Sequence, residues 1–412
     1  MRSAPGFFNV QPVDQALKTL FAAYDPNPRS IALDPRGALG YILAETPRSP
    51  NDLPLFVRST MDGYAVRAAD TFGASQSLPA YLTCTGTVVM GTAPAITIGP
   101  GQAVEIYTGA MLPPGADAVV MVERTQLLGD DQIEVLAPVA PGENLVRVGE
   151  DVAQGKAILP AGHRIRPQDI GGLLAVGILS IEVAVPPRVA ILSSGDELVP
   201  PDQSPGPGQV RDINTYTLAA LVQEAGAAVR VISFTRDTLD DLYSHARSGL
   251  DEADMLVMTA GSSVSTRDLT RDVISRLGKP GILQHGLAVK PGKPTILAVC
   301  DNKPVIGLPG NPVSALLVAR QIVVPLIKRA LGENPTYPAT TKATLRANIA
   351  SATGRDDTIP VRLMEDNGTL VADPVFGKSN LIYTLVDADG LVYVPLNSNG
   401  LKAGTLVDVY PF

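Results

Sequence analysis

The chain has 412 residues, of which 45% are hydrophobic and 18% charged, so we expect a folded protein of about three domains. Its formal net charge of −8 and the lack of a basic face argue against nucleic acid as a partner. No apolar run approaches the ~20 residues that a membrane helix needs, and no signal-peptide pattern opens the chain, which predicts a cytoplasmic protein without a membrane segment. Cys84 and Cys300 fit no metal-binding spacing, so we expect two reduced thiols.

Helices are predicted near the N-terminus, because apolar residues recur at helical spacing across residues 13–46. Between residues 51 and 152, Gly/Pro turns alternate with short β-rich runs, which predicts a small β domain. Residues 153–186 return to a mixed pattern that includes a helix over 167–176. We expect that helix to pack on the N-terminal one, so that 1–50 and 153–186 form one elongated mixed domain into which the β domain is inserted.

Strands and helices alternate between residues 187 and 333. The strands are predicted over 189–193, 229–234, 255–259 and 304–308, and the helices over 214–225, 238–250, 268–277 and 313–331. This alternation predicts a doubly wound parallel sheet with helices on both faces. Short β-rich runs over residues 334–412 predict a C-terminal β barrel. The predicted fold class is therefore multidomain α/β plus β.

Two loops at the predicted carboxyl ends of strands carry polar and small residues. Ligands of an open α/β sheet bind at these ends, where hydroxyls and backbone N–H groups suit an anion and carboxylates suit a hard cation. The same residues are also typical of polar turns and helix caps, so both interpretations stay open. The residues are Ser194, Gly195, Asp196 and Glu197 in the first loop, and Gly261, Ser262, Ser263 and Asp268 in the second.

A third loop joins a predicted strand to a helix through Pro309, Gly310, Asn311 and Pro312. A rigid turn with Asn311 as N-cap and Pro312 at the first helical position accounts for these residues. It does not account for Lys290 and Lys293, which lie just upstream on a proline-stiffened segment. Such a pair favours phosphate or oxyanion binding, with a solvated surface pair as the alternative.

Six motifs along the chain carry a family resemblance. They are Met61-Asp-Gly-Tyr-Ala-Val, Thr108-Gly-Ala with Gly115-Ala-Asp-Ala-Val-Val, Gly149-Glu-Asp, Ser194-Gly-Asp-Glu-Leu, Lys290-Pro-Gly-Lys-Pro and Gly307-Leu-Pro-Gly-Asn-Pro-Val-Ser. The order of these motifs resembles that of the molybdopterin molybdenumtransferases, the MoeA family, which includes the gephyrin E domain. The match spans nearly the whole chain, and it implies a MoaB/Mog-like α/β domain.

The resemblance implies an enzyme that inserts molybdate into adenylated molybdopterin, giving molybdenum cofactor and AMP with the help of Mg²⁺. It also implies a homodimer whose cleft lies between the α/β domain of one subunit and the inserted domain of the other. A separate molybdopterin adenylyltransferase would supply the substrate in trans. The implied catalytic residues are Asp62, Asp151, Asp237, Lys290 and Lys293; the Mg²⁺ ligands are Asp62, Glu197 and Asp268; and Thr108 and Ser379 join the three loops in binding the substrate.

Several positions depart from the family pattern, including Ile213, which replaces a serine. Ala260 and Ser265 replace glycines of a family loop, and Pro360 stands where the family often has arginine. Alanine and serine rarely adopt the positive φ that glycine allows, so this loop is expected to differ in shape. Two other functions therefore stay open: a nucleotide pyrophosphatase of the CinA type, and a non-catalytic molybdopterin carrier or scaffold paralogue.

Overall fold

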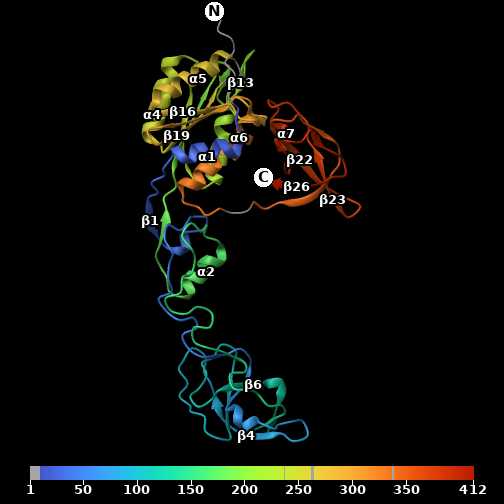
Figure 1. Ribbon diagram of the computed structural model, residues 1–412. Helices are drawn as coiled ribbons and strands as arrows, with labels where there is room; N and C mark the ends of the chain where they lie inside the picture. Colours follow the sequence, from blue (N-terminus) through green and yellow to red (C-terminus); the bar gives the residue numbers. More distant parts are fainter. Residues whose placement is uncertain (1–9, 236, 261–263, 336–337) are drawn as a thin grey trace, which may run out of the picture.

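The computed structural model describes residues 10–235, 237–260, 264–335 and 338–412, and for 231–234, 260 and 264–268 it describes the backbone alone. The molecule is elongated (Figure 1). An α/β layer and a barrel lie at one end and a β-rich insertion lies at the other, joined by a narrow stalk. Among the helices of the described ranges, none combines the length and apolar character that a membrane crossing requires.

A six-stranded sheet forms the centre of the α/β layer, in the order β14-β11-β15-β19-β18-β16. The four predicted strands are confirmed and run parallel. Strands β18 and β16 were not predicted, and β18 pairs antiparallel with both β19 and β16. The sheet is therefore mixed at one edge rather than parallel throughout. In spatial order the strands are Ala228–Thr235, Arg188–Ser194, Met255–Ala260, Lys303–Pro309, Ile296–Cys300 and Pro280–His285.

A tight hairpin explains the antiparallel edge. Asp301 and Asn302 join β18 to β19, and both have positive φ, 52° and 61°. Two such residues form the turn that matches the twist of antiparallel strands, and Asp and Asn tolerate this conformation best after glycine. Cys300 ends β18 in the core, and burial, with nearby Asp301, raises the pKa of its thiol to about 11. Cys300 is thus a protonated core thiol.

Helices cover both faces of this sheet, as predicted. Apolar side chains from α1, α3 and α6 share one core with Ile191, Val257 and Ile306, while those from α4 and α5 share the opposite core with Leu192 and Met258. The face alternates along each strand because successive side chains point to opposite sides. The helices are Val13–Ala23 (α1), Asn214–Glu224 (α3), Leu239–Glu252 (α4), Val264–Leu277 (α5) and Pro312–Ala330 (α6).

The N-terminal region departs from two predictions. Helix α1 forms, but residues 36–44 do not continue a helix. A short 3₁₀ turn over Pro35–Gly37 is followed by isolated β-bridges from Ile42 to Arg164 and from Leu43 to Val183. Gly40 lies at φ 80° and ends any helical path. Apolar spacing alone could not reveal this. The signal lies in the glycine and proline residues that interrupt the apolar pattern.

Helix α2 (Pro167–Ala175) does not pack as expected either. Its Leu173 shares a core with Ala38 and Leu43 in the stalk, whereas α1 packs on α6 and β18 of the α/β layer. The contact that α2 makes with the N-terminal region therefore goes to Ala38 and Leu43. The segments that flank the insertion are joined instead by antiparallel pairing of β1 (Ser30–Leu33) with β10 (Ile181–Ala184).

The insertion is a six-stranded sheet in the order β6-β3-β5-β4-β8-β7. Gly63 shows why a motif glycine is needed here: a Cβ at this position would lie 1.9 Å from the carbonyl oxygen of Val120 on β6. The strands are Ala118–Met121, Gly63–Val66, Gln102–Ile106, Ala80–Thr87, Gln132–Val135 and Thr125–Leu128. Strands β2 (Arg58–Ser59) and β9 (Leu145–Val146) pair antiparallel, and in the chain they come just before and just after this sheet.

The C-terminal region forms the predicted barrel. Strands β22, β23, β20, β26 and β24 pair in that order, and β24 pairs back with β22 to close it. Strand β17, which precedes β18 in the chain, adds parallel to β22 and so joins the α/β layer to the barrel. These strands are Asp356–Asp366, Thr369–Pro374, Thr341–Leu345, Leu406–Pro411, Gly390–Val394 and Val289–Lys290.

The remaining elements are β12 (Leu198–Val199), β13 (Val210–Arg211), β21 (Ile349–Ala350), β25 (Gly400–Leu401) and α7 (Tyr383–Val386).

One arginine connects the stalk to the α/β layer, and its loss is expected to be costly. Arg164 donates to Glu333 Oε2 (2.7 Å) and to the carbonyls of Gly40 and Ala225, and the Glu333 side chain is only 4% exposed. We expect Arg164→Ala to lower the free energy of unfolding by about 2 kcal/mol, because it leaves a buried carboxylate with only a more distant lysine. Chemical denaturation measures this.

A matched control is Arg346→Ala, which removes an exposed ion pair on the barrel surface and should change stability little. Equal losses for the two variants would contradict the role of Arg164.

Candidate functional site

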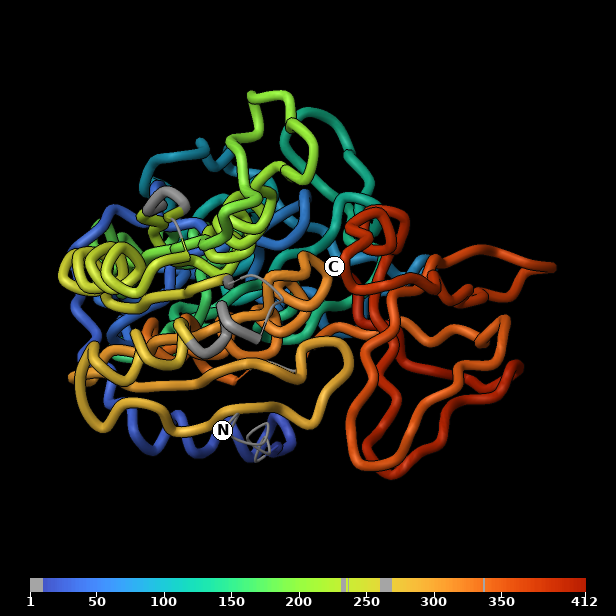
Figure 2. The backbone as a smooth tube through the Cα atoms, turned by 90° about the horizontal axis from the view of Figure 1, so that it is seen from above, coloured from blue at the N-terminus to red at the C-terminus, as the bar shows by residue number. Residues whose placement is uncertain are grey.

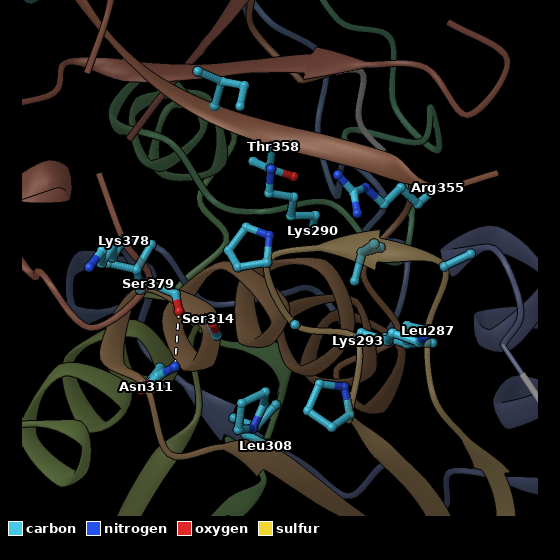
Figure 3. Close-up of a pocket in the computed structure, with 18 of the residues that line it drawn as sticks. Leu287, Lys290, Lys293, Leu308, Asn311, Ser314, Arg355, Thr358, Lys378 and Ser379 are labelled. Carbon is cyan, nitrogen blue, oxygen red and sulfur yellow. Dashed lines mark hydrogen bonds between the residues drawn. The ribbon is translucent and has the colours of Figure 1, made fainter. Parts of the chain in front are cut away.

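A pocket of about 810 Å³ lies between the carboxyl edge of the α/β sheet and the barrel. Figure 2 shows the barrel beside the α/β layer, and Figure 3 shows the pocket that both of them line. Its walls come from the turn 290–294, the end of β19 with the start of α6, and the barrel segments 350–360 and 375–379. Residues from two structural units thus converge on one space.

The pocket is strongly cationic. Lys290, Lys293, Arg355 and Lys378 line it, and no acidic residue is among the described residues that form its wall. Several cations around a concave surface attract a small, highly charged anion, and arginine adds paired donors. The pocket therefore suits a phosphate or another oxyanion, in agreement with the prediction made from the two lysines.

The lysine-bearing turn is fixed against helix α6. A Cβ on Gly292 would lie 2.1 Å from Val318 Cγ2, so only glycine allows this close approach at a φ of 115°. Thr295 Oγ1 donates to the Gly292 carbonyl (2.7 Å), and Leu287 N donates to the Lys293 carbonyl (2.9 Å). The turn thus presents its lysines from a rigid base.

The start of α6 meets the barrel directly. Asn311 occupies the N-cap position and Pro312 is the first helical residue, as predicted. The Asn311 side chain, however, does not cap the helix: its Nδ2 donates to Ser379 Oγ (2.9 Å), the bond drawn in Figure 3. Val313 N donates to the Ser379 carbonyl (3.1 Å). The barrel loop therefore supplies the cap and places Ser379 in the pocket.

A second group of predicted residues gathers at the carboxyl ends of β11 and β14, on the same edge of the sheet. Asp237 N donates to Asp196 Oδ1 (3.3 Å), and Ser194 ends β11. Burial raises the pKa of the Asp237 carboxyl, and the charges of Asp196 and Glu197 raise it further. Carboxylates that repel one another at a sheet edge fit a hard cation that binds between them and a ligand's phosphates.

Asp62 and Thr108 meet in the insertion. Thr108 donates to Asp62 Oδ1 from its backbone N (2.7 Å) and its Oγ1 (2.8 Å), and these bonds lower the pKa of the Asp62 carboxyl. Asp62 directly precedes β3, which pairs with β6, and Figure 1 places β6 at the opposite end of the molecule from β19 and β22. Within one chain, therefore, Asp62 and Thr108 do not join the pocket; Asp151 is exposed in a turn where Val152 pairs with Leu53.

The expected Mg²⁺ ligands are likewise spread out. Asp62 lies in the insertion and Glu197 at the α/β edge, and the side chain of Asp268 is outside the described part. Across the described side chains, no group of three or more His, Cys, Asp or Glu residues lies close enough together to hold a metal ion by itself. Gly261, Ser262 and Ser263 lie outside the described residues, as do the side chains of Ala260 and Ser265.

Several pocket residues were missed from the sequence, among them Arg355, Thr358 and Lys378. They lie on the barrel, and nothing in a short β-rich run indicates which face meets another unit. One signal was present, because Lys378 directly precedes Ser379, which the family resemblance had singled out.

These features define a multidomain α/β plus β protein with an anion pocket between its sheet edge and its barrel. Three family descriptions match successive parts of the chain: the MoeA N-terminal region (domain I and II) at residues 11–177, a probable molybdopterin binding domain at 190–329, and the MoeA C-terminal region (domain IV) at 342–412. The chain belongs to the MoeA family.

Relatives of similar length support this membership. A putative molybdopterin biosynthesis protein of Methanocaldococcus jannaschii is 34% identical, with 98% of each chain covered. Molybdopterin molybdenumtransferase 2 of Mycobacterium tuberculosis is 32% identical over 93% of this chain and 95% of its own. A solved molybdopterin biosynthesis MoeA protein from Pyrococcus horikoshii is 29% identical with a TM-score of 0.86, covering 98% of this chain and 100% of its own. The predicted family and fold class are thus confirmed.

We expect the acidic cluster at the sheet edge, formed by Asp196, Glu197 and Asp237, to cost stability. Because the pKa of Asp237 is raised in the folded protein, ionising it opposes folding as the pH rises above the ordinary value of 3.8. We therefore expect Asp237→Asn to melt at a higher temperature than the wild type near neutral pH, with the difference shrinking as the pH falls toward that value. Thermal unfolding at several pH values tests this.

The exposed Asp202→Asn serves as the control and should show no such pH-dependent gain. A gain for Asp237→Asn that does not change with pH would argue against repulsion as its cause.

Proposed function

We propose that the chain is a cytoplasmic molybdopterin molybdenumtransferase, which inserts molybdate into adenylated molybdopterin and yields molybdenum cofactor and AMP. The observation that carries this proposal is the cationic pocket at the carboxyl edge of the sheet, built against Ser379 of the barrel. Membership of the MoeA family supports it, because curated relatives at 30–32% identity bear this name. A separate adenylyltransferase would supply the adenylated pterin.

The pocket residues have distinct roles in this proposal. Molybdate is a tetrahedral dianion, so Lys290, Lys293 and Arg355 would neutralise its charge while the Ser379 hydroxyl, held by Asn311, orients one oxygen. The substrate's pyrophosphate linkage would lie along the sheet edge toward Ser194, where backbone N–H groups and hydroxyls favour phosphate. This arrangement brings the two anionic substrates together before the P–O bond that releases AMP is broken.

Magnesium is the cation that the acidic cluster would accept. Asp237 and Glu197 supply hard oxygen ligands, and the raised pKa of Asp237 reflects charges that a dication would neutralise. Mg²⁺ commonly uses only one or two protein carboxylates and takes its other ligands from phosphates and water. When bound it would polarise the phosphoryl group that leaves with AMP.

A second copy of the chain would complete the cleft. The inserted domain, for which we propose the limits 51–152, carries Asp62 and Thr108 at the far end of the stalk from the pocket (Figure 1). A two-fold dimer allows the insertion of one subunit to reach the α/β domain of the other. On this proposal Asp62 acts on the partner's pocket rather than on its own.

Release of AMP is the direct test of the activity. We expect the purified protein with adenylated molybdopterin and Mg²⁺ to release AMP only when molybdate is added. Lys290→Ala should raise the molybdate concentration that half-saturates the reaction by about tenfold, while the KM for the pterin nucleotide changes little, since the lysine contacts the oxyanion. Release without molybdate would indicate a pyrophosphatase instead, and binding without release would indicate a carrier.

Mixed dimers test the shared cleft. A dimer of one Asp62→Asn chain and one Lys290→Ala chain, isolated through two different tags, keeps one intact site of two. We expect it to recover about half of the wild-type activity although each parent homodimer is impaired.

In the matched control, both substitutions lie in one chain that is paired with a wild-type chain. Shared clefts would then both be broken, whereas a cleft within one chain would keep about half of the activity. Half activity in this control would contradict the dimeric site.

A further inference from the structure

Asp357 is a fully buried carboxylate behind the wall of the pocket. Its relative exposure is 0%, and it lies on β22 where the parallel strand β17 pairs with the barrel, directly in register with Lys290. It is not among the residues that line the pocket, so an incoming anion does not touch it. A buried charge in this position requires an explanation, because it costs folding free energy unless it is paired.

Two cations of the pocket wall reach this carboxylate. Arg355 Nε donates to Asp357 Oδ1 (2.9 Å), and Lys290 Nζ lies 3.9 Å from Oδ2. Within the described part of the chain Oδ2 is buried and accepts no hydrogen bond, so Lys290 faces it across a short gap. Both cations remain partly exposed, with 58% of the Lys290 and 37% of the Arg355 side chain accessible. Figure 3 shows both side chains reaching into the same part of the pocket.

Without a counter-ion these two cations would repel each other. Like charges at close range favour separation, and long side chains such as lysine and arginine have many other rotamers available. A carboxylate that pairs with both of them offsets the repulsion. It holds the guanidinium through Nε, so the outer N–H groups are not used by Asp357. The two cations are therefore held together before any anion arrives.

We propose that Asp357 is a positioning residue for oxyanion binding, which holds Lys290 and Arg355 side by side at the pocket wall. The proposal rests on the proposed function, since it concerns the anion that this pocket takes. Partners that orient metal ligands without touching the metal typically change affinity by about 10–100-fold when they are removed, and we expect the low end of that range here. Asp357 would thus act on affinity for the oxyanion alone.

The sign of the effect separates this role from simple electrostatics. Deleting a negative charge beside an anion site raises the local positive potential, which by itself strengthens anion binding. Loss of the fixed arrangement of Lys290 and Arg355, in contrast, weakens anion binding. A purely structural pair, in turn, would lower stability without any selective change in affinity.

The test uses the full-length protein and molybdate as the probe. We expect Asp357→Asn, which keeps the side-chain size and an acceptor for Arg355, to weaken molybdate binding in equilibrium dialysis by about tenfold. In the AMP-release assay the molybdate concentration at half saturation should rise in parallel, while the KM for the adenylated pterin stays unchanged. Asp357→Glu keeps the charge and should recover part of the lost affinity.

Asp356→Asn is the matched control. This neighbouring residue on β22 lies outside the pocket and accepts from Leu396 N rather than from a cation, so its substitution should leave molybdate affinity at the wild-type value. Circular dichroism and melting temperature show whether each variant is folded. If Asp357→Asn does not fold, Asp357→Glu alone tests the geometry, because it keeps the charge but moves the carboxylate and should weaken molybdate binding partly.

The outcomes distinguish this role from the proposed function. A wild-type protein that binds no molybdate would overturn both. Molybdate binding by the wild type that is unchanged or tighter in Asp357→Asn would overturn the positioning role alone. Equal loss in the Asn and Glu variants, with a matching fall in melting temperature, would identify Asp357 as a structural residue only.

Discussion

The junction between the α/β sheet and the barrel is the interaction on which the candidate site depends. Strand β17 leaves the α/β layer to pair with β22, and the N-terminus of α6 donates to the Ser379 carbonyl. Backbone hydrogen bonds fix position more strictly than side-chain contacts do, because they leave little freedom of register. The pocket is therefore defined by two units that cannot shift independently without losing the placement of Lys290 relative to Ser379.

The elongated shape follows from a different constraint. The two segments that flank the insertion are tied by β1–β10 pairing and by the contacts of Arg164, so the stalk leaves the α/β layer in one direction. The small sheet at the end of this arm has a hydrophobic core of its own. It therefore does not contribute to the two cores of the α/β layer. An arm that carries Asp62 away from its own pocket is, however, compatible with the dimer that we propose.

The sequence predicted elements where local chemistry decides the structure, and it failed where tertiary contacts decide. The four parallel strands and α3 to α6 have strong periodicity, and Asn311 and Pro312 mark the start of α6. The β18–β19 hairpin had a local signal in Asp301-Asn302 that was not used. No local pattern could show that Asn311 donates to the barrel or that Arg355 enters the pocket, since both depend on how distant units meet.

Pro360 illustrates how charge in this pocket is distributed rather than assigned to one position. It lines the pocket at a position where the family resemblance had led us to expect arginine, and proline brings no charge there. Arg355, on the same side of the barrel, and Lys378 nevertheless line the same space. Binding of a compact dianion depends on the summed field of the surrounding cations and on a fixed geometry for a few donors. A pocket with Arg355 anchored on a buried carboxylate meets both conditions, which makes proline at position 360 compatible with oxyanion binding.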